Sequence, residues 1–199
     1  MSFIINPYKV QAASSCATPV VGTNVQLGAL STTAAWNPAY GLFNYSVSGN
    51  IYIAGTVGGA KQITGIQIQP TGFTTPYSFD NQEIWMGTVT NTNFSASPQV
   101  NFSDMTFVVP LTKVKNAFTY TISANNVWQS ITFDTNFCYD GTNSLLLVWR
   151  NYDGSWQSGY GGWQVANVVS RNMYAGNDTS FPTGTGTRTN YPLLIKLNY

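Results

Sequence analysis

The sequence predicts an all-β protein, an antiparallel β-sandwich or jelly roll with an extended N-terminal arm, and three observations carry this prediction. Only 8% of the 199 residues are charged, so the helix-favouring residues Lys and Glu are scarce. Short runs rich in Val, Ile, Thr, Tyr and Phe, which favour strands, recur along the chain. Clusters of turn-forming residues separate these runs, as expected of a chain that reverses direction often.

The segment 128–154 shows the strand pattern most clearly. Ile131, Phe133 and Phe137 alternate with polar residues, which predicts a strand with one buried face. The run 145–149 is apolar throughout, which predicts a strand covered on both faces. Between the two runs, Asp140-Gly141 predicts a turn in which Gly141 takes a positive φ.

We expect residues 1–24 to form the arm and residues 25–199 to form a single sandwich domain, because no Pro- or Ser-rich linker and no internal repeat divides the longer part. The strands are expected at 25–30, 45–54, 61–69, 83–90, 106–111, 118–123, 128–133, 144–152, 163–169 and 193–199. Turn-rich breaks fall at 58–59, 70–72, 125–126 and 140–141. The Gly- and Thr-rich run 184–189 is expected to be a mobile loop before the last strand.

The arm combines a short apolar patch with a stretch of small residues. The patch that we expect to dock onto a partner consists of Phe3, Ile4, Ile5, Pro7 and Tyr8. A brief apolar arm with a flexible continuation suits docking onto another surface. An edge strand of the same domain is the alternative, and the sequence leaves both open.

The composition excludes several kinds of chemistry. Without His, the chain has neither Ser/His nor Cys/His catalysis of its own, nor one of the common zinc sites. The seven carboxylates are spaced as turn caps rather than as a catalytic pair, so we expect no enzyme and no cofactor. Asp140 and Asn143 offer oxygen ligands for a weak calcium site, but turn formation is the favoured role, and no metal is expected.

Two kinds of partner are also excluded. The eight Lys and Arg residues are scattered and the net charge is +1, which argues against nucleic-acid binding. No segment reaches the roughly 18 apolar residues needed to span a bilayer, so no membrane insertion is expected. The two cysteines, Cys16 and Cys138, permit one disulfide, but the favoured interpretation is two small, partly buried residues.

The loop 151–163 is the best candidate for a ligand site. Its glycines leave the aromatic residues Tyr152, Trp156, Tyr160 and Trp163 with little cover. Exposed aromatic faces stack on sugar rings, and nearby amides and carboxylates bind hydroxyl groups, so we expect these four residues to bind glycans. In the alternative, Trp163 packs inside the domain and Trp156 caps its edge.

The segment that begins at Trp128 resembles β-sandwich modules that recur in secreted adhesins of Bacteroidetes-type bacteria. The matching positions are Trp128, Ile131, Phe133, Thr135, Phe137, Tyr139, Asp140, Gly141, Thr142 and Leu145. Ser144 departs from the pattern, which has Asn there. The resemblance covers roughly residues 45–199 and implies an adhesive, spacer or carbohydrate-binding role. Separately, the opening FIINPYK, residues 3–9, is similar to the start of many bacteriophage tail and head-surface proteins.

These features predict a non-enzymatic virion surface protein of a bacteriophage: a capsid decoration, head fibre or tail component docked by its arm. The expected partners are other virion proteins or sister subunits, in a homo-oligomer, and a host surface glycan. Residues 1–9 lack the basic and long apolar regions of a secretion signal, which favours a place on the virion surface. The alternative is a bacterial secreted adhesin or carbohydrate-binding module, located outside the cell or on its surface.

Overall fold

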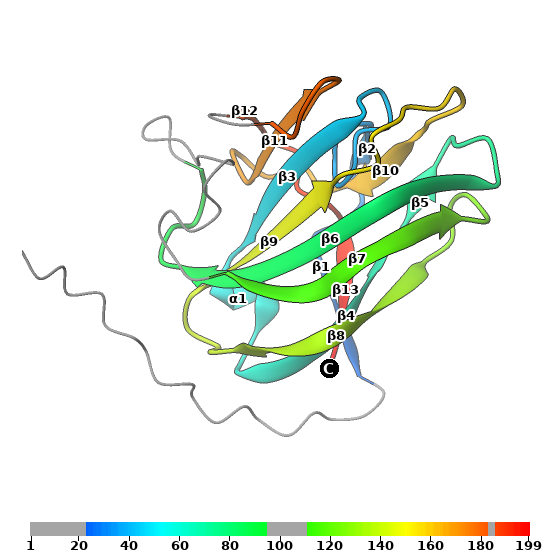
Figure 1. Ribbon diagram of the computed structural model, residues 1–199. Helices are drawn as coiled ribbons and strands as arrows, with labels where there is room; N and C mark the ends of the chain where they lie inside the picture. The colour runs from blue at the N-terminus through cyan, green and yellow to red at the C-terminus, as the bar shows by residue number, and fades with distance from the viewer. Residues whose placement is uncertain (1–22, 95–110, 183–185) are drawn as a thin grey trace, which may run out of the picture.

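A computed structural model describes residues 23–94, 111–182 and 186–199 and shows antiparallel sheets packed as a sandwich (Figure 1). The predicted all-β class is confirmed. The described residues contain one short helix, α1 (Ala54–Val57), and no helix among them could cross a membrane. The five arm residues expected to dock onto a partner lie outside the described residues, as does most of the strand expected at 106–111.

Two main layers and one small sheet make up the sandwich. The larger layer has the strand order β12 (Thr187–Thr189), β11 (Asn172–Asn177), β3 (Tyr45–Tyr52), β9 (Ser144–Asn151), β6 (Tyr77–Val89) and β7 (Thr112–Ile122). The facing layer has the order β1 (Asn24–Leu27), β13 (Ile195–Asn198), β4 (Lys61–Ile68) and β8 (Gln129–Tyr139). The small sheet contains β2 (Thr32–Ala34), β10 (Gly162–Val165) and β5 (Pro70–Thr71). The Gln164 N–H donates to the carbonyl of Gln69, so this sheet continues the four-stranded layer beyond β4.

Strand β9 lies between β3 and β6 and is buried on both faces, as its apolar run predicted. Leu145, Leu147 and Trp149 face the core between the layers, whereas Leu146 and Val148 belong to a second cluster on the opposite face. The alternation in β8 also agrees with the prediction, because its apolar residues are buried and most of the residues between them are exposed.

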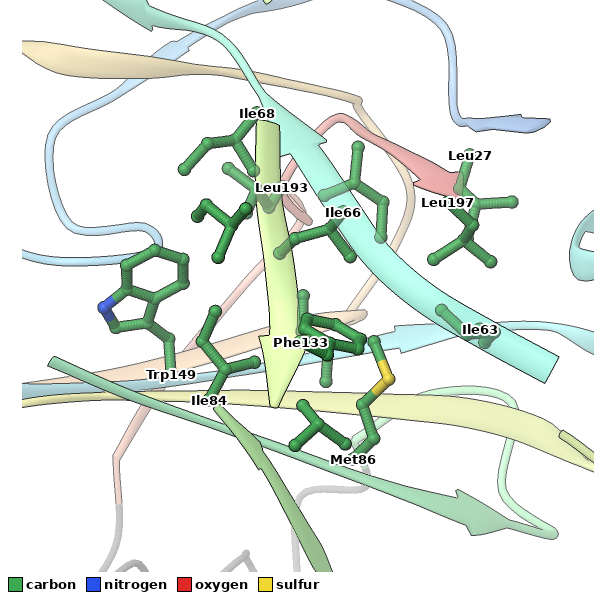
Figure 2. Packing of buried hydrophobic residues seen from close by; sticks show 14 of the residues in the cluster. Leu27, Ile63, Ile66, Ile68, Ile84, Met86, Phe133, Trp149, Leu193 and Leu197 are labelled. Atoms are coloured by element: carbon green, nitrogen blue, oxygen red, sulfur yellow. The ribbon is translucent and has the colours of Figure 1, made fainter. Parts of the chain in front are cut away.

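The main core fills the space between the two layers (Figure 2). Trp149, Ile84 and Met86 come from the six-stranded sheet and lie opposite Ile66 and Phe133 of the four-stranded sheet. Burying a large apolar side chain of this kind contributes roughly 1.5–3 kcal/mol. Such a core makes the sandwich a rigid support for the loops at its ends.

A second, smaller cluster covers the outer face of the six-stranded sheet. It is built on residues such as Val47, Val148 and Met173, and Phe94 folds over it from the end of the β6 segment. Trp85 borders this cluster, with the ammonium of Lys113 4.9 Å from its ring centroid. Because both faces of this sheet carry apolar side chains, its central strand β9 has a continuous apolar run rather than an alternating one.

The turn between β8 and β9 has the geometry that the sequence predicted. Gly141 has a φ of 77°, and the Asp140 carboxylate accepts hydrogen bonds from the backbone N–H groups of Thr142 and Asn143. Burial alone would raise the pKa of Asp140, but hydrogen bonds from Asn143 and Thr142 outweigh it and hold the pKa below its ordinary value. This carboxylate therefore serves the turn, and the described residues hold no group of three or more acidic, His or Cys side chains that could bind a metal.

Several expected elements need correction. Strands β6 and β7 begin earlier than predicted and β8 continues to Tyr139, because polar residues on their exposed faces interrupt the apolar pattern. Strands β2, β5 and β11 were not predicted; in β11 an Ala-Gly-Asn run hides the strand pattern. Residues 187–189, expected in a loop, form β12 and pair with β11. Strand β1 begins at Asn24, one residue before the expected strand 25–30, and ends at Leu27.

Cys138 differs from the favoured interpretation. It is exposed, not partly buried, because it points outward from β8. It is also disulfide-bonded. The other cysteine of the chain, Cys16, lies outside the described residues.

Replacing Gly141 by Ala should destabilise the protein by at least about 1 kcal/mol, because a side chain strains the positive φ and a Cβ would clash with the backbone nitrogen of Ala60. Thermal unfolding of the variant measures this loss. Gly55→Ala is the control, since a Cβ there meets nothing within 4 Å. Equal melting temperatures for the wild type and Gly141→Ala would contradict the turn assignment.

Candidate functional site: the loop end of the sandwich

Loops from both layers meet at one end of the sandwich, the upper right in Figure 1. We call this region the loop end; it comprises residues 35–44, 72–76, 123–128, 152–161 and 178–182. Backbone hydrogen bonds join the loops to one another. The Gly154 N–H donates to the Asn44 carbonyl over 2.9 Å, and the Thr74 N–H donates to the Gly159 carbonyl over 2.8 Å. The loops therefore form one continuous surface.

Trp163 is not a glycan-binding residue in this structure, which corrects the sequence prediction. It is fully buried in β10, and its indole N–H donates to the carbonyl of Ala39 over 3.0 Å. Its ring packs in the main core against Phe73, with 5.2 Å between centroids. The alternative interpretation of the sequence, in which Trp163 packs inside the domain, is therefore confirmed.

The other three predicted glycan-binding residues do not form one platform. Trp156 is 57% exposed at the loop end. Tyr160 is half-buried and packs against the core and against Gly41, where a Cβ would lie 2.5 Å from the Tyr160 Cβ. Tyr152 is stacked on Phe181, with ring centroids 4.4 Å apart. Trp156 and Tyr160 therefore remain candidates, whereas one face of the Tyr152 ring is already covered.

The sequence analysis did not predict a group of aromatic rings that lies near Tyr160. We call it the ring cluster; it consists of Trp36, Tyr40, Phe43, Tyr174 and Tyr191, all half-buried. Trp36 stacks on Tyr174 at 5.2 Å, and Tyr40 meets Phe43 edge-on at 5.1 Å. Tyr40 also contacts Tyr174 at 6.2 Å. The three aromatic residues between positions 36 and 43 were the available signal, but their partners come from β11 and the segment before β13.

Tyr40 connects the ring cluster to the aromatic loop. Its pKa is raised by burial and then by the neighbouring hydroxyl groups of Tyr160 and Tyr174. Tyr160 and the exposed Trp156 belong to the same loop. Two side-chain atoms in this region, Trp36 Nε1 and Asn44 Oδ1, are buried and make no hydrogen bond within the protein.

A chain of buried hydrogen bonds ties the loop end to the core. The Trp149 indole N–H donates to the Gln82 side chain over 2.7 Å, and the Gln82 amide donates to Asn151 Oδ1. Asn151 Nδ2 in turn donates to the hydroxyl of Ser46, which also accepts the backbone N–H of Tyr40. Every member of this chain except Tyr40 is buried, so the position of the 35–44 loop depends on residues inside the sheet.

Asp153 is the titratable group most affected by its surroundings at the loop end. Burial raises its pKa to about 6; a hydrogen bond from Ser155 opposes this, and the Asp80 carboxylate adds to the rise. The backbone N–H of Asp153 donates to Asn151 Oδ1 over 3.0 Å, which connects the residue to the buried chain. Deprotonation of Asp153 therefore places a second negative charge beside Asp80.

The described carboxylates serve as hydrogen-bond acceptors within the fold. Glu83 binds Lys113, Asp134 binds Lys115, and Asp178 accepts the backbone N–H of Asn44. Asp80 accepts the hydroxyl of Thr119 over 2.7 Å, and Asp153 accepts the hydroxyl of Ser155. This arrangement resembles turn and strand stabilisation more than a pair of carboxylates across a cleft.

A cavity of about 80 Å³ lies away from the loop end, between Leu27, Tyr52 and Arg171. Pockets for small molecules usually measure about 300–1,000 Å³. This cavity is therefore too small for a sugar, and a ligand of the loop end would bind on its surface.

No protein-family model, curated protein or solved structure matches this chain. The resemblances to adhesin modules and to phage surface proteins therefore stay predictions from the sequence. The evidence for a function is therefore the geometry of the loop end, where partly exposed aromatic rings and side-chain carboxylates are held by loops on a rigid β-sandwich.

Asp153→Asn should raise the stability of the protein at pH 7–8 and flatten its dependence on pH. The folded pKa of about 6 lies above the ordinary value of 3.8, so the stability linked to this proton is complete below about pH 4. It is lost as the pH rises through 6. Melting temperatures between pH 4 and 8 test this expectation.

Asp134→Asn is the control, because it should change the stability at neutral pH in the opposite direction to Asp153→Asn. A side-chain hydrogen bond from Lys115 is the main cause of the lowered pKa of Asp134, so the neutral variant should be less stable than the wild type at pH 7. An Asp153→Asn variant with a lower melting temperature than the wild type at pH 8 would contradict the assigned environment of Asp153.

Proposed function

We propose that this chain is a non-enzymatic surface protein of a bacteriophage virion, as a capsid decoration, head fibre or tail component. Its N-terminal arm docks it to other virion proteins or to sister subunits, and its loop end binds a host glycan. The observation that carries the glycan-binding part is that one end of the sandwich holds the ring cluster, Tyr160 beside Tyr40, and the exposed Trp156 in the same loop as Tyr160. Aromatic faces beside hydroxyl-binding side chains suit the stacking of sugars.

The path of the chain supports a separation between the docking arm and the proposed glycan site at the loop end. Strand β1 pairs with β13 from Asn24↔Asn198 to Leu27↔Ile195, and Ile195 in turn pairs with Ile68. Since β4 leads from Ile68 into the loop end, β1 runs toward that end from the far side. The C-terminus lies beside the start of β1 at the lower edge of the molecule in Figure 1, and the loops lie at the upper right. An arm before residue 23 therefore joins the sandwich away from the proposed glycan site.

The hydrogen bonds of the carboxylates support a non-enzymatic role. Hydrolysis of a glycosidic bond normally needs two carboxyl groups flanking the bond within a cleft. Asp80 and Asp153 are neighbours at the loop end, but Asp153 is engaged with Ser155 and with the backbone N–H of Asp80. Binding without turnover is the simpler role for this surface.

The disulfide at Cys138 fits a second candidate equally well, a bacterial secreted adhesin or carbohydrate-binding module. Disulfides persist in oxidising surroundings, which include extracellular proteins and virion surfaces, and are rare in the cytosol. The two candidates share the glycan site and differ in whether the arm joins the protein to a particle.

Glycan binding is tested on an array of host surface glycans with the wild-type protein and Trp156→Ala. We expect hits for the wild type and a loss of about tenfold or more in affinity for the variant, because the exposed indole supplies stacking area. Val169→Ala is the control, since Val169 is 68% exposed but lies outside the loop end. An array without hits, or hits that survive in Trp156→Ala, would leave Trp156 without a role in binding.

Docking by the arm is tested by deleting residues 2–12, which keeps both cysteines. The truncated chain should remain folded, with an unchanged β-type circular dichroism spectrum, and should no longer join phage particles or sister subunits. Burial of each large apolar side chain of the arm would contribute roughly 1.5–3 kcal/mol to docking before ordering costs. If the truncated chain does not fold, the arm belongs to the sandwich; if it still joins particles, another surface docks the protein.

A further inference from the structure

We infer that the glycan bound at the loop end is a neutral oligosaccharide and that acidic sugars, such as sialylated, uronic or sulfated ones, are rejected. This inference rests on the proposed glycan-binding function and adds the class of ligand. It follows from the distribution of charge around the rings.

Two carboxylates of the chain, Asp153 and Asp178, belong to the loop end, and a third, Asp80, neighbours Asp153 from strand β6. Asp153 lies in the aromatic loop, and Asp80 lies next to it at the start of β6. Asp178 lies on the other side of the 35–44 loop, where its carboxylate accepts the Asn44 N–H and its carbonyl accepts the Asn44 amide. Above pH 6 the proposed site therefore has negative charge beside the aromatic loop and beside the ring cluster.

The loops themselves supply no cation, and among the described residues the two cations that contact them, Arg150 and Lys196, come from strands β9 and β13. The described loop-end segments contain neither Lys nor Arg. The nearest cation along the chain is Arg150. Its guanidinium lies on the outer face of the six-stranded sheet, 4.7 Å from the Trp85 ring and 5.6 Å from the Phe181 ring, and it donates to the hydroxyl of Tyr152 over 3.4 Å. Lys196, on β13, lies over the ring of Trp128, 4.4 Å from its centroid. Both cations thus already have aromatic partners.

Recognition of an acidic sugar normally uses a cation. Carboxylates and sulfates are bound by Arg or Lys through charge-assisted hydrogen bonds, which are roughly twice as strong as neutral ones. A ligand carboxylate placed beside Asp80 and Asp153, or beside Asp178, would meet a like charge. The hydroxyl groups of a neutral sugar donate hydrogen bonds, and ionised carboxylates and tyrosine oxygens accept them. The loop end therefore suits hydroxyl-rich, uncharged ligands.

The decisive experiment compares matched glycans that differ only in a terminal acidic group, a neutral oligosaccharide and its sialylated or sulfated form. Binding is measured at pH 7.5 in about 0.01 M and about 0.15 M salt, where the screening lengths are about 30 Å and 8 Å. We expect the acidic form to bind at least about tenfold more weakly at low salt, with a smaller difference at high salt.

Removing the charge should relax this discrimination. The double variant Asp153→Asn, Asp178→Asn keeps the shape of both side chains and should bind the acidic glycan more tightly than the wild type does, with little change for the neutral glycan. Asp134→Asn is the control, because it removes a carboxylate of β8 that is paired with Lys115 of β7. It should leave the discrimination between acidic and neutral glycans unchanged.

The outcomes separate the two claims. Equal or tighter binding of the acidic form by the wild-type protein overturns the inference and leaves glycan binding intact. A preference for neutral glycans that persists unchanged in the double variant also overturns it, because the carboxylates would then not be the cause. If neither form binds, the proposed function fails and the inference fails with it.

Discussion

The indole N–H of Trp149 is a hydrogen-bond donor enclosed in the apolar core, and much of the structure depends on how it is satisfied. A buried donor without an acceptor costs about 1–3 kcal/mol. Gln82 supplies the acceptor from the neighbouring strand, and its own amide group must then find acceptors of its own. It finds them in Asn151 and in the carbonyl of Asp80. The hydrogen-bonding requirement of one ring in the core is thus passed on to residues near the ends of strands β9 and β6, beside the loop end.

This transfer explains why the loop end is held in place although it contains little regular structure. Asn151, at the end of β9, pairs with Ser46, near the start of β3. Their side chains accept the backbone N–H groups of Asp153 and Tyr40, in the two loops that carry most of the exposed rings. A polar chain of this kind rigidifies a site only when each member has its partner. The loop end therefore has the order of the core beneath it, which is what a preformed binding surface needs.

The strands and the turn at Gly141 were predictable because they depend on local pattern. Alternation along β8 and the apolar run of β9 report which faces are buried, and a glycine after Asp reports a positive φ. Which aromatic residue of the loop enters the core was not predictable in the same way. Trp156 and Trp163 have similar neighbours in sequence, but only Trp163 reaches the carbonyl of Ala39, more than a hundred residues away in the chain.

The ring cluster was missed for a related reason. Its members come from the 35–44 loop, from β11 and from the segment before β13, and a linear reading treats these as separate connections. The strand that carries Tyr174 is interrupted by Gly176, which hides it from a pattern search. The carboxylates around the rings are likewise scattered in sequence, and they reach one end of the sandwich only through the pairing of β6, β9, β3 and β11.

The pairing of β1 with β13 has a mechanical consequence. Four residue pairs join the first described strand to the last one, and β1 points from the far side of the sandwich toward the loop end. If the protein is held before Asn24 and pulled at the loop end, the force acts along these strands. Antiparallel hydrogen bonds lie perpendicular to the strands, so such a force shears the pairs together instead of opening them one after another. The fold therefore resists tension along this axis better than a sideways pull that peels β1 from its sheet.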